Sequence, residues 1–553
     1  MDLRADPQSV EFAYRRAPEQ AAPGDSPAQT AAPVTHPVVI VGAGPVGLTL
    51  AIDLAMRGQP VVLLDNDHKL STGSRAICFA KRTLEIWDRL GVGQPMVDKG
   101  VSWRIGRVFF GEAPVYSFDL LPEPGHERPA FINLQQYHAE AVLVERALAL
   151  PLIDLRWWNK VTALAQHGDH VALDVDTPDG PYTVRAQHVV ACDGSRSTLR
   201  SLMGLQASGR VFQDRFLIAD VSIDGELFED GRSERWFWFD PPFHPGQSVL
   251  LHRQPEGQWR VDFQLGWDAD PELERQPDRI TPRIQALLRG GFGRDVPFTI
   301  CWASVYTFAC QRMESFRHGR VLFAGDAAHG VSPFGARGAN SGVQDADNLG
   351  WKLAAVLRGD AGPSLLDSYG SEREFAADEN LLNSTRSTDF ITPKSAISRL
   401  FRDAVLTLAR DHAFARRLVN SGRLSVPATL SASPLNSADV DAFSGAMVPG
   451  APAVDAPLRH AGRPAWLLRL LGHGFTLVCF GASPAWAVTL PVQLLAIDGD
   501  NVIDIDGLAA ARYDATPGCA YLLRPDQHVC ARWRAPTEAQ VRSALARAMG
   551  ADT

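Results

Sequence analysis

The segment VVIVGAGPVGLTLAIDLAMRGQPVVLLD, from Val38 to Asp65, constrains the fold of this 553-residue chain more than any other. A short β-branched run at Val38 to Val41 is followed at once by glycines. An apolar-periodic stretch from Val46 to Met56 and a second apolar run at Pro60 to Leu64 come next. This order predicts a strand, a tight turn, a helix and a second strand, which is typical of an α/β fold.

Three glycines, Gly42, Gly44 and Gly47, fit the pattern GxGxxG between the first strand and the helix. The first allows the tight turn, the second lets a pyrophosphate approach the backbone, and the third lets helix and strand pack closely. Asp65 ends the second strand, where a carboxylate accepts hydrogen bonds from a ribose diol and repels a 2′-phosphate. The segment therefore predicts a bound dinucleotide, FAD or NAD rather than NADP.

A second glycine-rich stretch, GDAAHGVSPFGARGANSGVQDADNLGWKL, runs from Gly325 to Leu353. Asp326 follows a buried-strand pattern, and its carboxylate could accept hydrogen bonds from ribityl hydroxyls. Gly335 and Gly338 keep the backbone close to a ring, and the helix starting near Asn340 directs its positive end at a flavin. Taken alone, this stretch fits a loop that caps a structural helix equally well. Read together, the two glycine-rich stretches favour FAD.

Length and pattern divide the chain into several domains. A chain of 553 residues is too long for one hydrophobic core, so three or so domains are expected. Alternation around Trp259 to Leu265 predicts a mixed or antiparallel sheet with one covered face. The buried-strand pattern returns at Arg320 to Ala324, so the first domain resumes after an inserted one. The predicted divisions are an N-terminal extension (1–36), a FAD-binding domain in two parts (37–210 and 301–425, the second with a helical section), a substrate-binding sheet (211–300) and a C-terminal domain (426–553).

Composition narrows the class of partner. Lys and Arg number 54 against 63 Asp and Glu, giving a net charge of −9, and no basic run stands out. This argues against nucleic acid or a membrane surface as partner and favours a small molecule. The seven cysteines contain no CxxC pair, so we expect neither a disulfide framework nor a metal site, but reduced thiols in a cytoplasmic protein. The N-terminal segment is polar and rich in Pro and Ala, which predicts a flexible or surface-lying extension rather than a secretion signal.

Three segments together resemble a known family. GAGPVG with Asp65, CDGSRSTLR at Cys192 to Arg200, and GDAAHGVSPFGARGAN at Gly325 to Asn340 are similar to the motifs of the single-component (class A) FAD-dependent aromatic hydroxylases. The length and the segment SRAICFAKRTLEIWDRLG look most like the branch of phenol, chlorophenol and 3-(3-hydroxyphenyl)propionate hydroxylases. The resemblance implies a Rossmann-like FAD-binding domain of the glutathione-reductase type, an inserted mixed β-sheet substrate domain and a thioredoxin-like C-terminal domain. The similarity covers roughly Val38 to Arg373 by specific motifs and the rest by architecture.

The family pattern assigns roles to individual residues. It makes Arg75 and Gln136 contacts to the FAD, and it places Asp193, Gly194 and Arg196 in a motif associated with both FAD and NAD(P)H. Pro333 falls beside the reactive flavin carbon, and His329 lies in the same motif as a catalytic candidate. The cofactor-binding set implied in full is Gly42, Gly44, Gly47, Asp65, Arg75, Gln136, Asp193, Gly194, Arg196, Asp326, Gly338, Ala339 and Asn340. Two features depart from the common pattern: Asp65 replaces glutamate, and Cys192 and FGARG replace small or Gly-Gly residues at the flavin entrance.

The chemistry that the resemblance implies is hydroxylation of a phenolic substrate with NADH or NADPH and O2, through a flavin C4a-hydroperoxide. Such chemistry needs a dry, aromatic pocket. The run WFWF places Trp236 and Trp238 on one face and Phe237 and Phe239 on the other. One of these faces, with the tryptophans preferred, is predicted to line the pocket with Phe334, although sheet core explains each residue equally well. Candidates for a base that ionises the phenol are His244, His252, Tyr306 and His329.

Alternatives stay open at this stage. The same scaffold could serve a monooxygenase that acts on a larger polycyclic or polyketide substrate by hydroxylation, epoxidation or Baeyer-Villiger insertion. From a different class, the chain could be a non-catalytic flavin-binding module. Halogenase, hydrolase and metalloenzyme signatures are missing from the sequence. A homodimer is compatible with the sequence.

Overall fold

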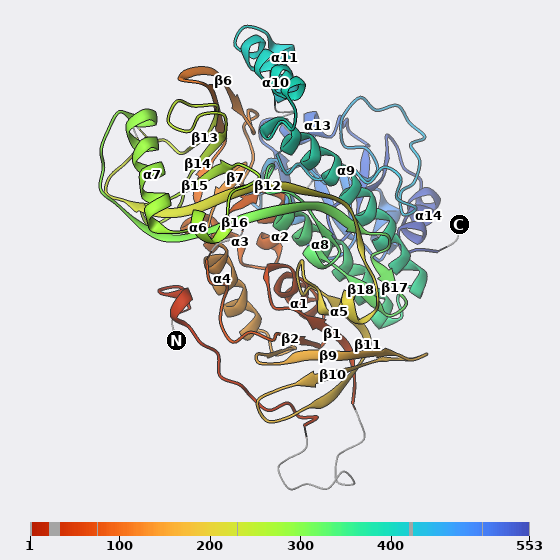
Figure 1. Ribbon diagram of the computed structural model, residues 1–553. Helices are drawn as coiled ribbons and strands as arrows, with labels where there is room; N and C mark the ends of the chain where they lie inside the picture. Colours follow the sequence, from red (N-terminus) through yellow and green to blue (C-terminus); the bar gives the residue numbers. More distant parts are fainter. Residues whose placement is uncertain are drawn as a thin grey trace.

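The computed structural model contains three large β-sheets with helices packed around them (Figure 1). It describes residues 3–20, 34–73, 76–228, 231–419, 424–499 and 501–551, without the side chain of Gln213. Within those ranges, no helix combines the length and the apolar character needed to cross a bilayer.

The first sheet has the predicted strand, turn, helix and strand at its centre. Strand β1 (Thr35–Val41) pairs in parallel with β2 (Val61–Leu64), and helix α1 (Pro45–Met56) makes the crossover between them. Its strands run in the order β17-β18-β11-β1-β2-β8, with β9 and β10 attached beside β11. The other strands are β8 (Ile153–Arg156), β9 (Lys160–Gln166), β10 (Val171–Asp176), β11 (Tyr182–Ala191), β17 (Arg317–His318) and β18 (Val321–Phe323).

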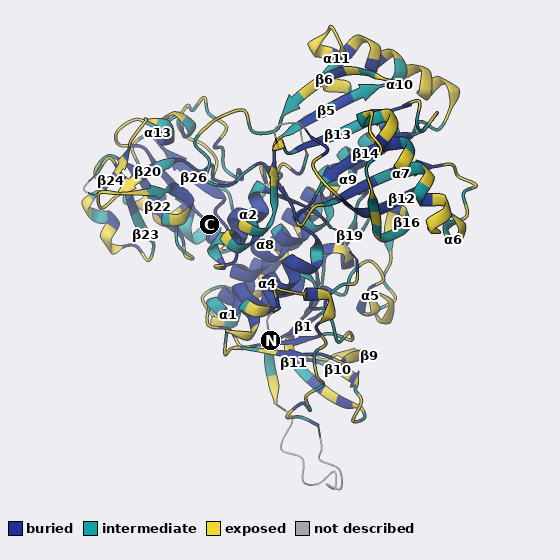
Figure 2. Ribbon diagram, turned by 90° about the vertical axis from the view of Figure 1, so that its left-hand side faces the viewer, coloured by how far each residue is buried: buried dark blue, intermediate teal, exposed yellow. Residues whose placement is uncertain are grey.

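Strand β18 belongs to the first sheet although it lies far along the sequence. It pairs in parallel with β11, so the chain returns to this domain as expected. Helix α8 (Gly338–Arg358) then packs against α1, and α4 (Gln136–Leu148) packs against α1 as well. The central strands are almost wholly buried, which explains their continuous Val, Ile and Leu runs (Figure 2).

The second sheet is mixed, in the order β19-β16-β12-β15-β14-β13-β5-β6. Strands β5 and β6 come from before the inserted region, and β13 pairs with β5 in parallel. The strands are β5 (Ile105–Phe110), β6 (Ala113–Asp119), β12 (Ala207–Ile223), β13 (Glu234–Phe239), β14 (Ser248–Arg253), β15 (Gln258–Leu265), β16 (Phe298–Met313) and β19 (His329–Gly330). Helix α7 (Pro277–Phe292), which the strand alternation does not predict, covers one face and buries Val261 and Phe263.

A small sheet stands between the first two, in the order β3-β7-β4. Its strands are β3 (Cys78–Ala80), β4 (Val101–Trp103) and β7 (Phe131–Asn133). Helices α2 (Lys81–Arg89) and α3 (Gly93–Lys99) connect the first two of these strands, and α2 also packs against α8.

The third large sheet forms the C-terminal domain, in the order β21-β20-β24-β23-β22-β25-β26. Its strands are β20 (Pro457–His460), β21 (Arg463–Trp466), β22 (Thr476–Phe480), β23 (Gln493–Ile497), β24 (Val502–Asp504), β25 (Ala520–Leu523) and β26 (Val529–Trp533). Helix α14 (Glu538–Ala548) is the last element of the domain, and a capping box at Thr537 begins it. Before this domain in the chain come helices α9 (Asp367–Ile391), α10 (Ala396–Ala409) and α11 (Ala413–Val419).

Part of the N-terminal extension lies on the first domain. Phe12 stacks on Trp157 with ring centroids 4.3 Å apart, and its backbone NH donates to His68 O. Leu3, Val10 and Ala17 are buried. Residues 3–20 are therefore a packed, surface-lying segment, whereas 21–33 lie outside the described residues.

Candidate active site

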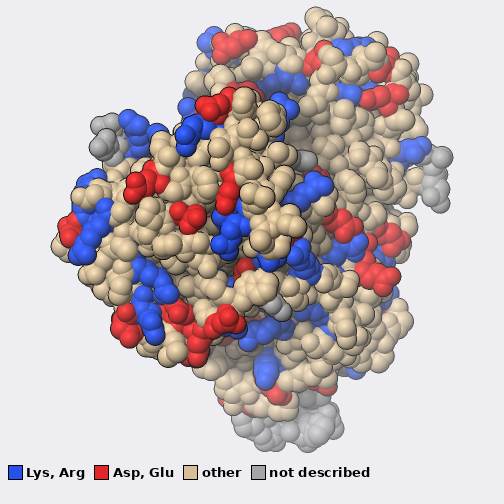
Figure 3. Space-filling model, turned by 45° about the horizontal axis from the view of Figure 1, so that its top comes forward, with Lys and Arg blue, Asp and Glu red and all other residues tan. Residues whose placement is uncertain are grey.

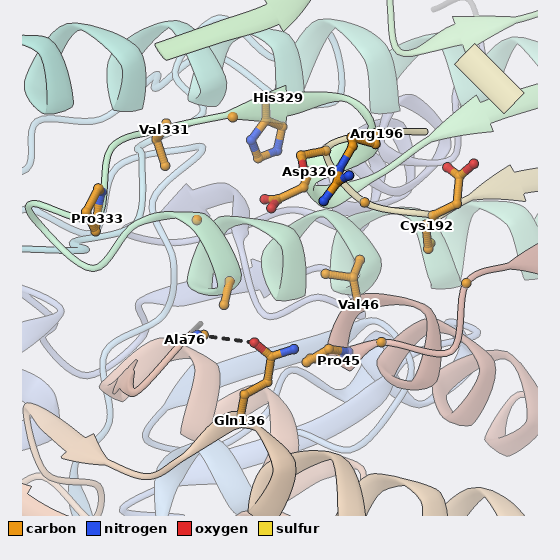
Figure 4. A pocket seen from close by; sticks show the side chains of 18 of the residues that line it. Pro45, Val46, Ala76, Gln136, Cys192, Arg196, Asp326, His329, Val331 and Pro333 are labelled. Atoms are coloured by element: carbon orange, nitrogen blue, oxygen red, sulfur yellow. Dashed lines mark hydrogen bonds between the residues drawn. The ribbon is translucent and has the colours of Figure 1, made fainter. Parts of the chain in front are cut away.

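The two glycine-rich stretches meet at one cavity. A Cβ added at Gly325 would lie 2.9 Å from Val46 Cγ2, and one at Gly342 would lie 2.6 Å from the same atom, so the start of α1 touches both the second stretch and α8. A cavity of about 870 Å³ opens beside this contact and is lined by Gly44 and Asp326 together. Figure 4 shows side chains from separate parts of the chain around it.

Of the three glycines in the first turn, Gly44 is the one whose missing side chain leaves open space. Gly42 has φ 106°, and a Cβ there would overlap Cys192 O, whereas a Cβ at Gly47 would overlap Gly42 O. Gly44 has nothing within 4 Å of its missing Cβ and faces the cavity at the N-terminus of α1. These clearances are compatible with the roles predicted for the three glycines, and binding of a pyrophosphate at Gly44 stays a prediction.

Asp65 is held in place by backbone donors. Its Oδ2 accepts from Ala43 NH at 2.6 Å and its Oδ1 from Asp67 NH at 2.8 Å. Burial raises the pKa of Asp65 even though both NH groups oppose the shift. The carboxylate lines the cavity at the end of β2, where a ribose diol can donate to it.

The Asp193 loop joins the two halves of the domain. Asp193 Oδ2 accepts from Leu199 NH at 3.0 Å, but Oδ1 is buried with no hydrogen-bond donor among the described residues. Burial raises the pKa of this carboxyl. Arg200 Nη1 donates to Ala327 O at 2.7 Å, which ties the loop to the Gly325 stretch, while Arg196 is exposed at the rim of the cavity. An orphaned acceptor in a cavity of this size fits a dinucleotide that carries hydroxyl donors.

The start of α8 faces the other part of the cavity. Asp326, Gly338 and Ala339 line it, and Asn340 joins them. The Asn340 side chain is saturated: Oδ1 accepts from Ala80 NH and Thr83 Oγ1, and Nδ2 donates to Cys78 O and Ala336 O. Only its backbone is therefore available to a ring, and its side chain fixes the helix start to the segment before it.

Ala336 shows what the FGARG departure does to the loop. It has φ 52°, in the left-handed region that glycine adopts more readily. The cavity side of the loop is otherwise as expected, since Pro333 and Phe334 both line it. Gln136 also lines it and accepts from Ala76 NH at 3.1 Å, as Figure 4 shows. Arg75 lies outside the described residues.

His329 lines the cavity and is anchored to Asp345. Its Nε2 lies 2.7 Å from Asp345 Oδ2, which also accepts from Gly325 NH at 2.9 Å. Asp345 Oδ1 accepts from Arg373 Nε at 2.6 Å. The ring is buried against Phe316. These contacts let His329 hold the loop in position, and its expected catalytic role stays a prediction.

The second sheet closes the cavity, but not with the predicted tryptophans. Trp236 and Trp238 pack on the face covered by α7, with Trp236 stacked on Phe292 at 5.1 Å and Trp238 edge-on to Phe243 at 5.6 Å. The prediction that they line the pocket is therefore wrong, because strand alternation turns the neighbouring residues towards the cavity instead. Those cavity residues are Arg235, His252, Arg260, Asp262 and Tyr306.

The alternation of residues in β15 already indicated a charged face of the second sheet. Arg260 and Asp262 alternate with the apolar face of β15, and a charged face is usually interpreted as solvated until a second domain is known to cover it. His252 and Tyr306, two of the base candidates, are in the cavity lining. His244 is not, since its Nε2 lies 2.7 Å from Gln264 O and its ring meets Phe263 on the α7 side.

Comparison with known proteins identifies the family of this chain. Residues 35–384 match the family model described as FAD binding domain. The chain is a member of that FAD-binding family. Its cofactor is FAD, and its relatives are flavin-dependent monooxygenases, so the protein is an enzyme of this type.

The relatives differ in how much of the chain they share. 6-Methylpretetramide 4-monooxygenase from Streptomyces rimosus is 31% identical over 90% of this chain and 90% of its own length. 3-(3-Hydroxy-phenyl)propionate/3-hydroxycinnamic acid hydroxylase from Mycolicibacterium smegmatis is 31% identical over 67% of this chain, and the matched part spans 64% of that relative. Among solved structures, the flavin-dependent monooxygenase PieE with FAD and substrate has a TM-score of 0.78 at 23% identity, over 94% of this chain and 100% of that one, which shows a shared fold.

Proposed function

We propose that the protein hydroxylates an aromatic, phenolic substrate with NADH or NADPH and O2. The observation that carries the proposal is the single cavity that joins both FAD stretches to a face of the second sheet. A cavity of about 870 Å³ is within the range of small-molecule and cofactor sites. Names of relatives that mention hydroxylated rings support the same reaction class.

The residues that would hold FAD divide by its two ends. Gly42, Gly44 and the N-terminus of α1 suit the pyrophosphate, and Asp65 suits the ribose. Asp326 and the first backbone NH groups of α8, from Gly338 to Asn340, suit the ribityl chain and ring. When bound, FAD supplies the redox chemistry that passes electrons from nicotinamide to O2 and oxygen to the substrate.

The protein's own contribution is positioning and exclusion of water. Pro333 and Phe334 stand on the loop before α8, and Phe334 packs edge-on against Phe216 and Phe308 at 4.8 and 5.4 Å. Phe308 and Phe334 line the cavity and make one apolar wall, and Phe216 packs against both of them. A dry wall of this kind protects reactive oxygen chemistry from side reactions.

A larger polycyclic substrate is the second candidate. The relative that matches along 90% of both chains is named for 6-methylpretetramide, while the hydroxyphenylpropionate relative matches over a shorter part.

We also propose that the C-terminal domain is thioredoxin-like. Strand β22 is parallel to β23 and antiparallel to β25, which is antiparallel to β26 and precedes α14. A parallel pair joined to an antiparallel pair and a closing helix, in the order β23-β22-β25-β26, is typical of that fold. Cys479, Cys519 and Cys530 are buried and contain no CxxC pair, so the domain serves packing rather than dithiol exchange.

A substrate panel tests the proposed reaction. Purified holoenzyme is mixed with single-ring and fused-ring phenols, and nicotinamide oxidation is scored with product mass and hydrogen peroxide. A product heavier by one oxygen atom supports hydroxylation, and the ring count of the best substrate separates the two candidates. Nicotinamide oxidation that yields only peroxide with every phenol would contradict the proposal.

A further inference from the structure

A buried arginine that forms no direct ion pair within the described ranges lines the cavity near Asp262. Arg235, on β13, is 4% exposed and lines the cavity. Within the described ranges its Nε has no hydrogen-bond partner and its guanidinium makes no ion pair. Its Nη1 donates to Cys78 Sγ at 3.7 Å. Because a buried charge is costly unless it is paired, the ligand of this cavity is the natural source of the missing partner.

A second buried arginine on the same face of the sheet has its charge paired within the protein. Arg260, on β15, is similarly buried, and its Nε and Nη2 donate to the two oxygens of Asp220, each at 2.7 Å. That bidentate pair neutralises Arg260 inside the protein. Arg235 has rings in place of a carboxylate: its guanidinium carbon lies 5.1 Å from the centroid of Phe237 and 5.7 Å from that of Trp103. The rings hold the guanidinium in place and leave its charge for a ligand.

His252 lies between the two arginines, opposite Arg235 on one side and opposite Arg260 on the other. Its Nε2 is 3.1 Å from Asp262 Oδ2, while Nδ1 is buried with no partner among the described residues. Burial lowers the pKa of His252 to about 4, so the ring is neutral near neutral pH. The pKa of Asp262 is held below its usual value by His252, Arg260 and Arg235 despite burial, so the carboxylate accepts from Nε2–H. Nδ1 then presents a lone pair.

We propose that Arg235 binds an anionic oxygen of the aromatic substrate, a phenolate or a ring carboxylate, while His252 Nδ1 accepts from a neighbouring hydroxyl. This inference rests on the proposed function and narrows its substrate class. An arginine at this place stabilises the ionised phenol, which is the electron-rich form that an electrophilic oxygen attacks. The apolar wall around Phe334 takes the ring itself.

Binding of matched probes tests the proposal independently of turnover. Benzoate is compared with benzamide, and 4-nitrophenolate, kept ionised by the buffer, with 4-nitroanisole. Each is titrated into wild-type holoenzyme, and its affinity is measured from the perturbation of the flavin absorption. We expect the anionic member of at least one pair to bind about 10- to 100-fold more tightly, the usual value of a hydrogen bond to a charged group. The pair that shows the difference identifies carboxylate or phenolate as the anion.

Three variants locate the effect. Arg235→Met should remove the preference for the anionic probe. Arg235→Lys keeps a positive charge and should keep part of that preference. It replaces Arg235→Met as the test variant if the methionine variant does not fold. Arg253→Met, on the neighbouring strand β14, removes a partly exposed arginine paired with Glu226 and should leave the preference unchanged.

Two results would overturn the inference. One is a wild-type enzyme that distinguishes neither pair. The other is an Arg235→Met variant that keeps the preference for anions, or that changes FAD retention and the flavin spectrum instead, because the arginine would then serve the cofactor. Either result leaves the proposed hydroxylation standing if the wild-type enzyme still forms oxygenated product, so the two failures are distinguishable.

Discussion

At the scale of single residues, the site depends on which positions lack a side chain and which side chains are already saturated. Gly44 and Gly47 belong to the same turn, but Gly44 faces the cavity whereas Gly47 presses on the backbone of Gly42. Asn340 is chemically able to bind a flavin, yet all of its side-chain hydrogen-bonding capacity is used by protein. The position of a residue in a motif does not show whether it faces the ligand or packs against protein. Contacts with distant segments of the chain decide this.

Two glycine variants separate cofactor binding from folding. We expect Gly44→Ala to fold with nearly unchanged stability and to weaken FAD binding by at least about tenfold, because its methyl group enters the cavity. Gly47→Ala should instead lower the stability of the apoprotein by about 1–3 kcal/mol through overpacking against Gly42 O. FAD titration and thermal unfolding of both apoproteins measure this. Equal effects of the two variants on either quantity would contradict the assignment.

Acid stability reports on the His329 and Asp345 pair. Burial alone would raise the pKa of Asp345, but His329, Arg373 and the Gly325 NH hold it below the ordinary 3.8. A carboxylate with a lowered folded-state pKa stabilises the protein above its unfolded pKa, and this stability is lost as the pH falls through the folded pKa. His329→Phe should therefore cost about 1–3 kcal/mol near neutral pH and move acid unfolding to higher pH.

The matched control is His460→Phe, at an exposed position on β20, which should leave the acid midpoint unchanged. Product formation distinguishes positioning from catalysis. If His329→Phe kept wild-type stability and FAD binding but lost all hydroxylation, a catalytic role would replace the positioning role.

At the scale of elements, the N-terminal segment supports the loop that follows Asp65. Phe12 stacks on Trp157, and Trp158 Nε1 donates to Phe12 O at 2.9 Å. The next residue along, Asn159, donates its NH to Asp65 O at 2.7 Å. The sequence shows only a polar, proline-rich extension here, since this contact joins positions 146 residues apart.

Phe12→Ala should loosen that support. We expect a loss of about 1–3 kcal/mol of stability, from the stacked pair and its burial, and a several-fold weaker affinity for FAD. Thermal unfolding and FAD titration measure the two effects. Arg16→Ala, which breaks an exposed ion pair with Asp179 in the same segment, is the control and should change neither. Unchanged FAD affinity in Phe12→Ala would show that the segment does not support the cofactor loop.

At the scale of the whole molecule, the C-terminal domain is joined to the FAD-binding domain by a buried ionic network. Arg524 pairs with Glu372 of α9 and with Asp526, each at 2.6 Å, and Lys352 of α8 pairs with Glu372 at 2.7 Å. All four side chains are fully buried. Trp351 of α8 packs edge-on against Phe475 of the C-terminal domain. The helix that begins at the flavin end of the cavity is thus fixed further along by another domain.

Breaking the network should be costly. Arg524→Met removes the guanidinium that pairs with both Glu372 and Asp526, while Lys352 still pairs with Glu372, so we expect a loss of about 3–5 kcal/mol. Arg542→Met breaks an exposed pair with Glu538 on α14 and should cost about 0.3–0.5 kcal/mol. Denaturant unfolding of the holoenzymes measures both. Similar small losses in the two variants would mean that the buried network does not hold the domains together.

Charges of both signs are mixed on one face of the molecule. On the face seen in Figure 3, Lys and Arg are interspersed with Asp and Glu, as expected for a chain of net charge −9 without basic runs.

The sequence by itself determined the elements of the FAD-binding domain, because local periodicity and glycine placement are properties of neighbouring residues. Strands β1 and β2 and helices α1, α4 and α8 were predictable in this way. The meeting of Gly44 with Asp326 at one cavity was expected from the two glycine-rich stretches taken together, as parts of one FAD site. Only the tertiary structure decided which face of the second sheet meets the cavity. Alternation along a strand shows that its two faces differ, but it does not show which element covers each face. In the structure, α7 covers the tryptophans, and the FAD-binding domain covers the face that carries Arg235.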